Sequence, residues 1–263
     1  MKIEVLISCM NQVDHSIIDR TNVQTDCIVI NQTDVESFEE FYFFNKKGDK
    51  CRVKFVSTIE RGLSRSRNMA LNYAEGDICL LCDDDESLVD DYEKRVLDAY
   101  SQFPDAGIIS FKINRRKSYP KSICKMNIIR ILRTSSVEIS INMSINRNLK
   151  IRFDELMGAG TGNGAGEENK FLMDCYKKNI PMYYIPVCIA SLLDSSSSWF
   201  QGYDEKFFKN HGWASRRILG NKLSLVYIFY FIVSHYNLYK KDISFRKALI
   251  NEIRGWLKNN IEV

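Results

Sequence analysis

Mainly apolar runs alternate with segments of helical period along most of this chain. The strongest runs are residues 2–8, 26–30, 51–57 and 78–82. The run at residues 78–82 has no polar alternation, which predicts a strand that is buried on both faces, as in a parallel sheet. Three later runs, residues 107–113, 126–133 and 137–145, predict further strands of the same sheet.

Amphipathic helices are predicted between these strands. Residues 63–73 have core candidates at Leu63, Met69, Ala70 and Tyr73, and residues 87–103 carry an apolar face that ends before Pro104. Alternation of strands and helices predicts an α/β fold, with a mixed sheet flanked by helices.

Four consecutive carboxylates, Asp83, Asp84, Asp85 and Glu86, follow the apolar run at residues 78–82. In open α/β sheets, ligands bind at the carboxyl ends of the strands. Adjacent acids raise one another's pKa values, and oxygen ligands of this kind suit Mg²⁺, Mn²⁺ or Ca²⁺. The pattern predicts a cation or ligand site. The alternative is that the acids belong to the first turn of the following helix.

A polar helix start precedes that strand. Gly62 follows the strand at residues 51–57, and the helix opens with SRSRN at residues 64–68. Hydroxyl, amide and guanidinium groups at a helix start favour a phosphate or a nucleotide. A basic, capped surface turn is the alternative. Together with the acids after the next strand, this start predicts a site for a diphosphate and its metal.

The string GLSRSRNMALNYAEGDICLLCDDDE at residues 62–86 resembles the donor site of family 2 glycosyltransferases with the GT-A fold. That family has a Gly-x-Ser-x-Ala/Ser-Arg-Asn segment, a helix, an apolar strand and an Asp-x-Asp motif. The resemblance extends to the N-terminus and, more loosely, to residue 215. It implies that the nucleotide sugar is bound by Ser8, Cys9, Met10, Asn11, Asn31, Gln32, Asp34, Gly62, Leu63, Ser64, Arg67, Asn68, Asp83 and Asp84.

The same resemblance implies a divalent cation, Mn²⁺ or Mg²⁺. Asp85 is the implied metal ligand, and Asp83 would contact the ribose or the water shell of the metal. His211 is a second candidate ligand, because GT-A enzymes often use a late histidine. The alternative for a lone histidine is a structural role.

A second chemical cluster is the sequence GAGTGNGAGEE at residues 158–168. Its glycines allow the backbone to approach a ligand closely, and Glu167 and Glu168 follow at the start of a helix. A solvent loop followed by helix-start acids is the alternative. The family has a Gly-rich loop and an acidic pair here, and its second acid is the general base. This implies Glu168 as the base, with Glu167 as the other candidate.

The implied reaction is transfer of a sugar, with inversion, from a nucleoside diphosphate sugar to an acceptor hydroxyl. UDP is the expected nucleotide, and the acceptor is a glycan or a lipid-linked glycan of a bacterial surface polysaccharide. Two other functions stay open, a sugar nucleotidyltransferase and a non-catalytic glycan-binding protein on the same fold. The first would need a basic Gly-rich loop after the first strand, where the chain has CMNQ.

Composition narrows the class of protein further. The formal net charge of the 263 residues is +4, which predicts no nucleic-acid partner. The eight cysteines lack zinc-site spacing, and those in apolar runs are predicted core thiols, which favours the reducing cytosol. A strand in the first residues predicts that no signal peptide is present.

The predicted boundary places the glycosyltransferase domain at residues 1–215 and a helical extension at residues 216–263. Within the extension, residues 223–233 are apolar but too short to span a bilayer. Lys and Arg accompany Leu, Ile and Trp in the last helix, which favours peripheral contact with the cytosolic face of the inner membrane. Helices that pack on the main domain, or that form a homodimer contact, are the alternatives.

Overall fold

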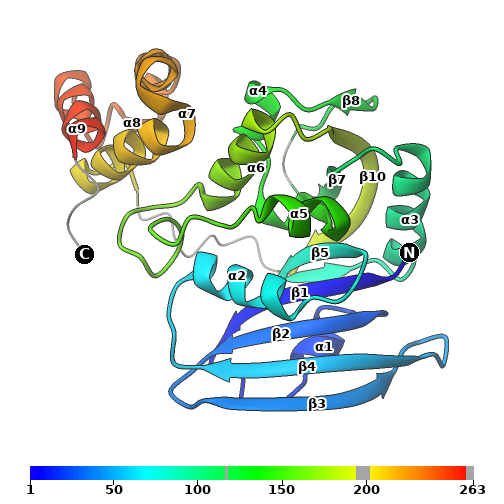
Figure 1. Ribbon diagram of the computed structural model, residues 1–263. Coiled ribbons are helices and arrows are strands. Elements are labelled where there is room, and N and C mark those ends of the chain that lie inside the picture. The colour runs from blue at the N-terminus through cyan, green and yellow to red at the C-terminus, as the bar shows by residue number, and fades with distance from the viewer. Residues whose placement is uncertain (116–117, 194–201, 259–263) are drawn as a thin grey trace.

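A ten-stranded mixed sheet runs through the protein, in the order β3-β4-β2-β1-β5-β9-β7-β10-β6, with β8 paired to β10 (Figure 1). The computed structural model describes residues 1–115, 118–193 and 202–258. A mixed sheet flanked by helices is therefore confirmed as the fold class.

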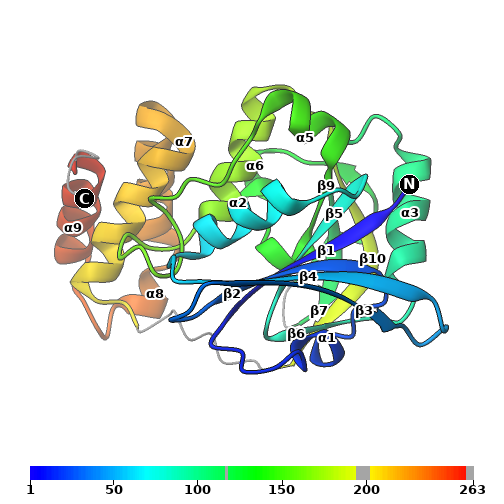
Figure 2. The ribbon, with the colours of Figure 1, turned by 60° about the horizontal axis from the view of Figure 1, so that its bottom comes forward.

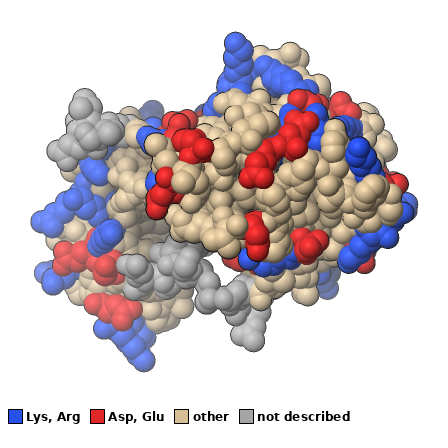
Figure 3. Space-filling model, turned by 90° about the horizontal axis from the view of Figure 1, so that it is seen from below, with Lys and Arg blue, Asp and Glu red and all other residues tan. Residues whose placement is uncertain are grey.

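The four strongest apolar runs form the parallel centre of this sheet, as predicted. They are β1 (Ile3–Met10), β2 (Asp26–Gln32), β4 (Lys50–Thr58) and β5 (Ile78–Asp83). Strand β3 (Ser37–Phe44) pairs antiparallel with β4 at the edge, and its largely exposed residues carry acids among uncharged side chains (Figure 3). Parallel pairing brings the carboxyl ends of β1, β2, β4 and β5 to one edge.

The second half of the sheet is mixed. Strand β9 (Ile139–Asn142) pairs antiparallel with both β5 and β7 (Ile108–Asn114), and β10 (Met182–Leu192) pairs in parallel with β7. The short strands β6 (Glu86–Leu88) and β8 (Cys124–Lys125) pair antiparallel with β10.

The strand predicted at residues 126–133 is wrong, and the strand predicted at residues 137–145 is wrong in part. Residues 126–133 contain the helix α4 (Ile128–Ile131), and residues 137–145 contain the 3₁₀ turn η1 (Ser136–Glu138), β9 and the start of α5 (Met143–Leu149). The reason is helix capping: the side chain of Asn127 accepts from the backbone N–H of Arg130, and that of Asn142 accepts from Ser144. Each cap begins a helix inside an apolar run.

Helices cover both faces of the sheet, each above its own apolar core. The helices α2 (Leu63–Tyr73) and α6 (Glu167–Lys177) lie on one face, together with part of α7 (Glu205–Ser234). The helices α1 (Ile17–Arg20) and α3 (Tyr92–Gln102) pack on the other face. Figure 2 shows α2 and α6 on the side of the sheet opposite to α1.

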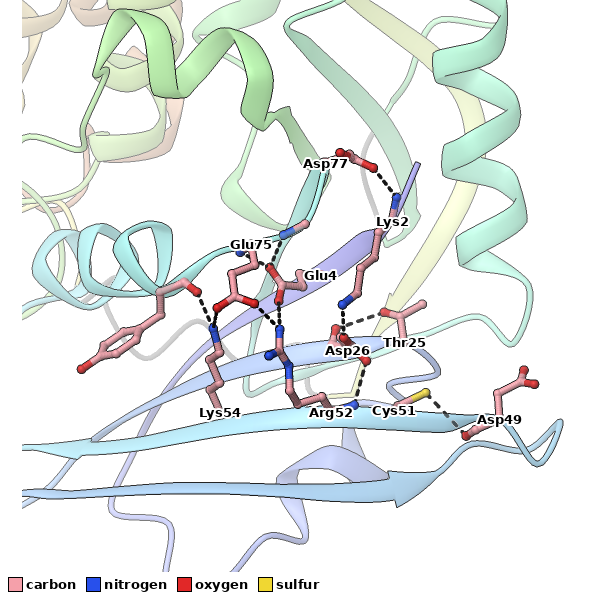
Figure 4. Close-up of polar contacts among 12 residues, drawn as sticks. Lys2, Glu4, Thr25, Asp26, Asp49, Cys51, Arg52, Lys54, Glu75 and Asp77 are labelled. Carbon is pink, nitrogen blue, oxygen red and sulfur yellow. Dashed lines mark hydrogen bonds and ion pairs between the residues drawn. The ribbon is translucent and has the colours of Figure 1, made fainter.

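An ion-pair network ties the strands together away from the carboxyl ends (Figure 4). Buried Glu4 accepts from the backbone N–H groups of Glu75 and Gly76, at 2.7 and 2.6 Å. The carboxylate of Glu75 pairs with Arg52 and Lys54, both at 2.5 Å. These contacts link β1, β4 and the segment that enters β5, so this end of the sheet is structural.

The C-terminal helices α7, α8 (Tyr236–Tyr239) and α9 (Phe245–Leu257) form a separate lobe with its own small core. Helices α7 and α9 approach closely because Gly212 and Gly255 have no Cβ. A Cβ on Gly212 would lie 2.0 Å from the carbonyl oxygen of Glu252. The predicted domain boundary at residue 215 falls inside α7 and stays a prediction.

Candidate functional site

The predicted nucleotide loops meet at the carboxyl edge of the parallel strands. Ser8 is paired in register with Ile30 of β2 and with Asp83 of β5, and Gln32 is paired with Thr58 of β4. The loops after β1 and β2 and the acidic turn after β5 therefore lie along one edge, as the sequence predicts.

The loop after β1 is held to the end of β2 by Asn31. Its Oδ1 accepts from the backbone N–H of Gln12 at 2.9 Å, and its Nδ2 donates to the carbonyl of Gln12 at 3.0 Å. Asn11 takes a left-handed conformation with φ 52°, and both Asn11 and Met10 are exposed. Cys9 is buried, and burial raises the pKa of its thiol to about 12, so it stays neutral. Met10 and Asn11 thus present the accessible surface of this loop.

The loop after β2 is joined to the start of α2. The side-chain oxygen of Gln32 accepts from the backbone N–H of Gly62 at 2.8 Å. Arg61 donates to the carbonyl of Thr33 at 2.7 Å and to Asp34 at 2.6 Å. The side chain of Gln32 therefore binds the backbone of Gly62, whereas the side chain of Asp34 remains largely exposed.

The polar start of α2 contacts protein groups. Ser64 donates to the carbonyl of Met157 at 2.7 Å, and Asn68 exchanges two hydrogen bonds with the backbone of Phe153, at 2.9 and 2.8 Å. The backbone N–H of Leu63 donates to the carbonyl of Ala159. These side chains hold the segment that leads to the Gly-rich loop, and their predicted contact with a nucleotide stays a prediction.

Arg67 links the two acidic clusters of the sequence. Its guanidinium lies 3.0 Å from Asp83 and 2.9 Å from Glu167, and its side chain is 2% exposed. Burial alone would lower the pKa of Arg67, but the charges of Asp83 and then Glu167 raise it above its ordinary value. The guanidinium is therefore a fixed positive charge beneath the site.

Glycines allow the loop at residues 158–166 to lie against α2 and Glu167. Gly158 has φ +98°, and a Cβ on it would lie 3.1 Å from the carboxyl carbon of Glu167. Gly160 has φ +86°, and its Cβ would lie 3.2 Å from the Cα of Gly62. Side chains at these two positions would separate the loop from the helix start.

The two acids that follow the loop have different surroundings. Glu167 is buried, accepts from Arg67, and accepts from the backbone N–H of Gly166 at 3.1 Å. Glu168 is half-buried and forms no ion pair with any side chain in the described ranges. Burial, together with the charge of Glu167, raises the pKa of Glu168 to about 8. Of the two, Glu168 has the surroundings of a proton acceptor.

Glu168 lies on the wall of a cavity of about 500 Å³ between the Gly-rich loop and α7. Backbone of the glycines forms one side of this cavity. Polar and aromatic side chains of α7 and its cap form the other, namely Asp204, Phe207, Asn210, His211, Tyr227 and Phe231. The volume and the mixed lining suit a sugar-sized ligand.

The acidic turn after β5 places its four carboxyls differently. Asp83 accepts from Arg67 and from the hydroxyl of Ser136 at 3.0 Å. Asp84 is half-buried, and burial followed by the charge of Asp83 raises its pKa. Asp85 is exposed, whereas Glu86 is fully buried and accepts from the backbone N–H of Asp83 at 3.2 Å. Ser136 was missed, because nothing in its local sequence marks it as a partner of Asp83.

The donor set of this turn fits a divalent cation only with help from a substrate. No group of three or more His, Cys, Asp or Glu side chains within the described part of the chain could hold a metal ion. The accessible oxygen ligands are carboxylates of the acidic turn, chiefly that of Asp85. Mg²⁺ is commonly held by one or two carboxylates while waters and substrate phosphates complete its coordination, and this turn has the chemistry for that arrangement.

His211 is held by the C-terminal helices. Its Nδ1 lies 2.7 Å from Oε1 of Glu252, a side chain of α9 that is fully buried. The imidazole stacks on the ring of Phe231 at 4.1 Å between centroids, and it lines the cavity. The hydrogen bond at Nδ1 leaves Nε2 as the ring nitrogen available to a ligand. Its role as a metal ligand stays a prediction.

Comparisons with known proteins agree with this geometry. A family model described as glycosyl transferase family 2 matches residues 8–154, which is more than half of the chain. None of the curated proteins compared with the chain matches it.

Solved structures of TarS from S. aureus share the fold. The crystal structure of TarS 1–349 in complex with UDP-GlcNAc has a TM-score of 0.62 and 15% identity, and the match covers 96% of this chain and 79% of that one. The complex with UDP has a TM-score of 0.60 and 14% identity, with coverages of 97% and 81%. A further TarS crystal structure matches with a TM-score of 0.58 and 14% identity over 92% of this chain and 45% of that chain.

At these sequence identities the similarity to TarS shows the fold alone, and the match to the family model shows the family of the chain. The mixed sheet, the acidic turn after β5 and the Gly-rich loop before α6 are arranged as the sequence resemblance implies. The chain therefore belongs to glycosyl transferase family 2 and has the GT-A glycosyltransferase fold.

Proposed function

We propose that the protein transfers a sugar from a UDP-sugar to an acceptor hydroxyl, with Glu168 as the general base and with inversion at the anomeric carbon. The observation that carries this proposal is the position of Glu168, on a cavity wall and without an ion-pair partner in the described ranges. Neighbours of the same fold bind UDP-GlcNAc and UDP, which supports UDP as the nucleotide.

The donor would lie along the carboxyl edge of the parallel strands. Asp34 and Asn11 are exposed there and would contact the nucleoside, and Asp83 and Asp84, at the end of β5, would contact the ribose and the diphosphate. Asp85 would hold Mn²⁺ or Mg²⁺, which supplies positive charge to the leaving diphosphate when it is bound. The ion pair with Arg67 would hold the carboxylate of Asp83 in place for this contact.

The acceptor would occupy the cavity in front of Glu168. Its hydroxyl donates a proton to the carboxylate of Glu168 as its oxygen attacks the anomeric carbon, and the diphosphate leaves from the opposite face. A single displacement of this kind inverts the configuration. Aromatic rings of α7 suit the apolar face of a sugar, and Asp204 and Asn210 offer groups that bind hydroxyls. A glycan or lipid-linked glycan of a surface polysaccharide at the cytosolic membrane face is the acceptor proposed.

Two variants at adjacent positions test the base. Glu168→Gln keeps the size of the side chain but cannot accept a proton, so we expect turnover to fall at least about a hundredfold while UDP affinity is unchanged. Turnover can be followed as UDP release from a panel of UDP-sugars, with water or added glycans as the acceptor.

Glu167→Gln is the matched control, because it changes the neighbouring acid in the same way. It should lower stability through its contact with Arg67 and reduce turnover less than Glu168→Gln. The base assignment is wrong if Glu167→Gln is the inactive variant and Glu168→Gln keeps near-normal turnover. A nucleotidyltransferase is indicated instead if the protein forms UDP-sugar and pyrophosphate from UTP and a sugar phosphate.

A further inference from the structure

Helix α7 is interrupted at Gly220. The backbone there has φ 75° and ψ −178°, which is not helical, although helical structure continues on both sides. By length and composition α7 is apolar enough to cross a membrane, and a third of its most apolar window is buried. The apolar part after Gly220 has only 14 residues, about 21 Å of helix, against a hydrocarbon core of about 30 Å. This half of α7 is therefore too short to span a bilayer.

The same half of α7 exposes a wide apolar face. Val226, Phe229 and Tyr230 are 69%, 61% and 60% exposed, and Leu223, Leu225 and Val233 are also exposed. At 100° per residue these side chains cover roughly 160° of the helix circumference, wider than the seam of a coiled coil. Residues 223–236 contain no Asp, Glu, Lys or Arg. A contiguous face of this kind on a surface indicates an interaction site.

Lysines flank this face along the chain, in a segment of net positive charge. Residues 216–263 contain nine Lys and Arg and three Asp and Glu, a net charge of +6, whereas residues 1–215 have 28 basic and 30 acidic residues, a net charge of −2. Lys222 lies at one end of the apolar face, and Lys240 and Lys241 lie just beyond the other. Figure 3 shows Lys and Arg at the outer margin of the C-terminal lobe. A basic, apolar surface is complementary to anionic lipid.

A second copy of the chain fits this surface poorly. In an antiparallel two-fold pair of these helices, Lys222 of one copy would face Lys240 and Lys241 of the other, and a parallel pair would bring Lys222 against its own counterpart. Like charges would meet in both arrangements, whereas an anionic surface attracts every one of them.

The exposed apolar face and the candidate cavity lie on opposite sides of the same half of α7. Tyr227 and Phe231 project from the inner side of the same helical turns and line the cavity that contains Glu168. One helix, about 10 Å across, therefore separates the cavity from the exposed apolar face.

We propose that residues 222–241 lie in the plane of an anionic lipid surface, with Leu223, Val226 and Phe229 in the acyl boundary and Lys222, Lys240 and Lys241 among the headgroups. This contact sets the cavity at the membrane surface, within reach of an acceptor that stays in the bilayer. Only the statement about the acceptor rests on the proposed function, because the protein can bind lipid without catalysing a reaction.

Vesicle co-sedimentation of the full chain tests the proposal. We expect the protein to sediment with vesicles of phosphatidylcholine mixed with phosphatidylglycerol at low salt, and to bind less at high salt or to phosphatidylcholine alone. Phe229→Glu should lower the partition coefficient of the protein between vesicle and solution about tenfold or more. A triple variant, Lys222→Gln with Lys240→Gln and Lys241→Gln, should lower the partition coefficient on anionic vesicles only.

Phe44→Glu is the matched control, because Phe44 is an exposed phenylalanine on β3 at 73% exposure, and it should bind vesicles as the wild type does. Val226→Glu repeats the test at a second exposed position, and UDP binding reports that each variant is folded. Failure of the wild type to sediment at low salt overturns the proposal, as does unchanged binding of both Phe229→Glu and Val226→Glu. A dimer in sedimentation velocity that Phe229→Glu dissociates, without vesicle binding, overturns it in favour of a contact between copies.

Discussion

Arg67 and Glu167, 100 residues apart in the sequence, form a buried ion pair with 2.9 Å between Nη1 and Oε1. The other terminal nitrogen of the guanidinium binds Asp83, so the acidic turn of the donor site and the acidic pair of the Gly-rich loop share one cation. A change in either cluster therefore reaches the other through Arg67.

Replacement of Arg67 should destabilise the fold. Arg67→Ala leaves the carboxylates of Asp83 and Glu167 without a cation, and we expect the free energy of unfolding to fall by about 3–5 kcal/mol in urea titrations. Arg65→Ala is the matched control on the same helix, because Arg65 is half exposed and lies 3.6 Å from Glu155. It should change stability by less than about 0.5 kcal/mol. Equal effects of the two variants would show that the buried pairs contribute no more than a surface contact.

Removal of the metal should weaken nucleotide binding through Asp85. We expect Mn²⁺ or Mg²⁺ to raise UDP affinity at least roughly tenfold over a chelator in calorimetry, a difference of about 1.4 kcal/mol. Asp85→Ala should abolish that difference, because it removes the accessible carboxylate of the turn. Asp98→Ala, an exposed acid on α3, should leave the difference intact. Identical affinities of the wild type with and without metal would refute the metal role.

Activity should increase with pH between about 6 and 9. The pKa of Glu168 is raised to about 8, so below that pH most molecules carry a protonated carboxyl that cannot accept the proton of the acceptor. The value of kcat/KM should therefore increase with pH and level off above the pKa of Glu168. Glu168→Gln should retain only residual turnover without this increase. A flat profile in the wild type over the same range would argue against Glu168 as the base.

The close contact at Gly158 should be sensitive to a single methyl group. Gly158→Ala places a Cβ against the carboxyl group of Glu167 and 3.3 Å from the hydroxyl of Ser64. Gly162→Ala is the control, because Gly162 also has a positive φ but a Cβ added to it would meet no atom within 4 Å. Both variants should lose roughly 1 kcal/mol of stability from backbone strain. Only Gly158→Ala should also reduce turnover, by displacing Glu167 and its neighbour Glu168; equal turnover in the two would contradict a role for this contact.

The local sequence was sufficient for the parallel strands β1, β2, β4 and β5 and for the chemical types at the site. Apolar runs such as residues 78–82 identify buried strands without reference to the rest of the chain, because burial on both faces excludes polar alternation. The acids at residues 83–86 and the glycines at residues 158–166 mark strand and helix ends by composition alone. Short helices at α4 and α5 were missed, since a single capping asparagine decides them inside an apolar run.

Only the tertiary structure separated acids that look alike in sequence. Glu86 is fully buried and accepts a hydrogen bond from the backbone of the acidic turn. Glu167 is buried in an ion pair with Arg67, whereas Glu168 lines a cavity. The partner of Asp83 at Ser136, and that of His211 at Glu252, come from segments distant in the chain. Local sequence determines which side chains are available and where elements begin, but the burial and pairing that set their pKa values depend on contacts made only when distant segments pack together.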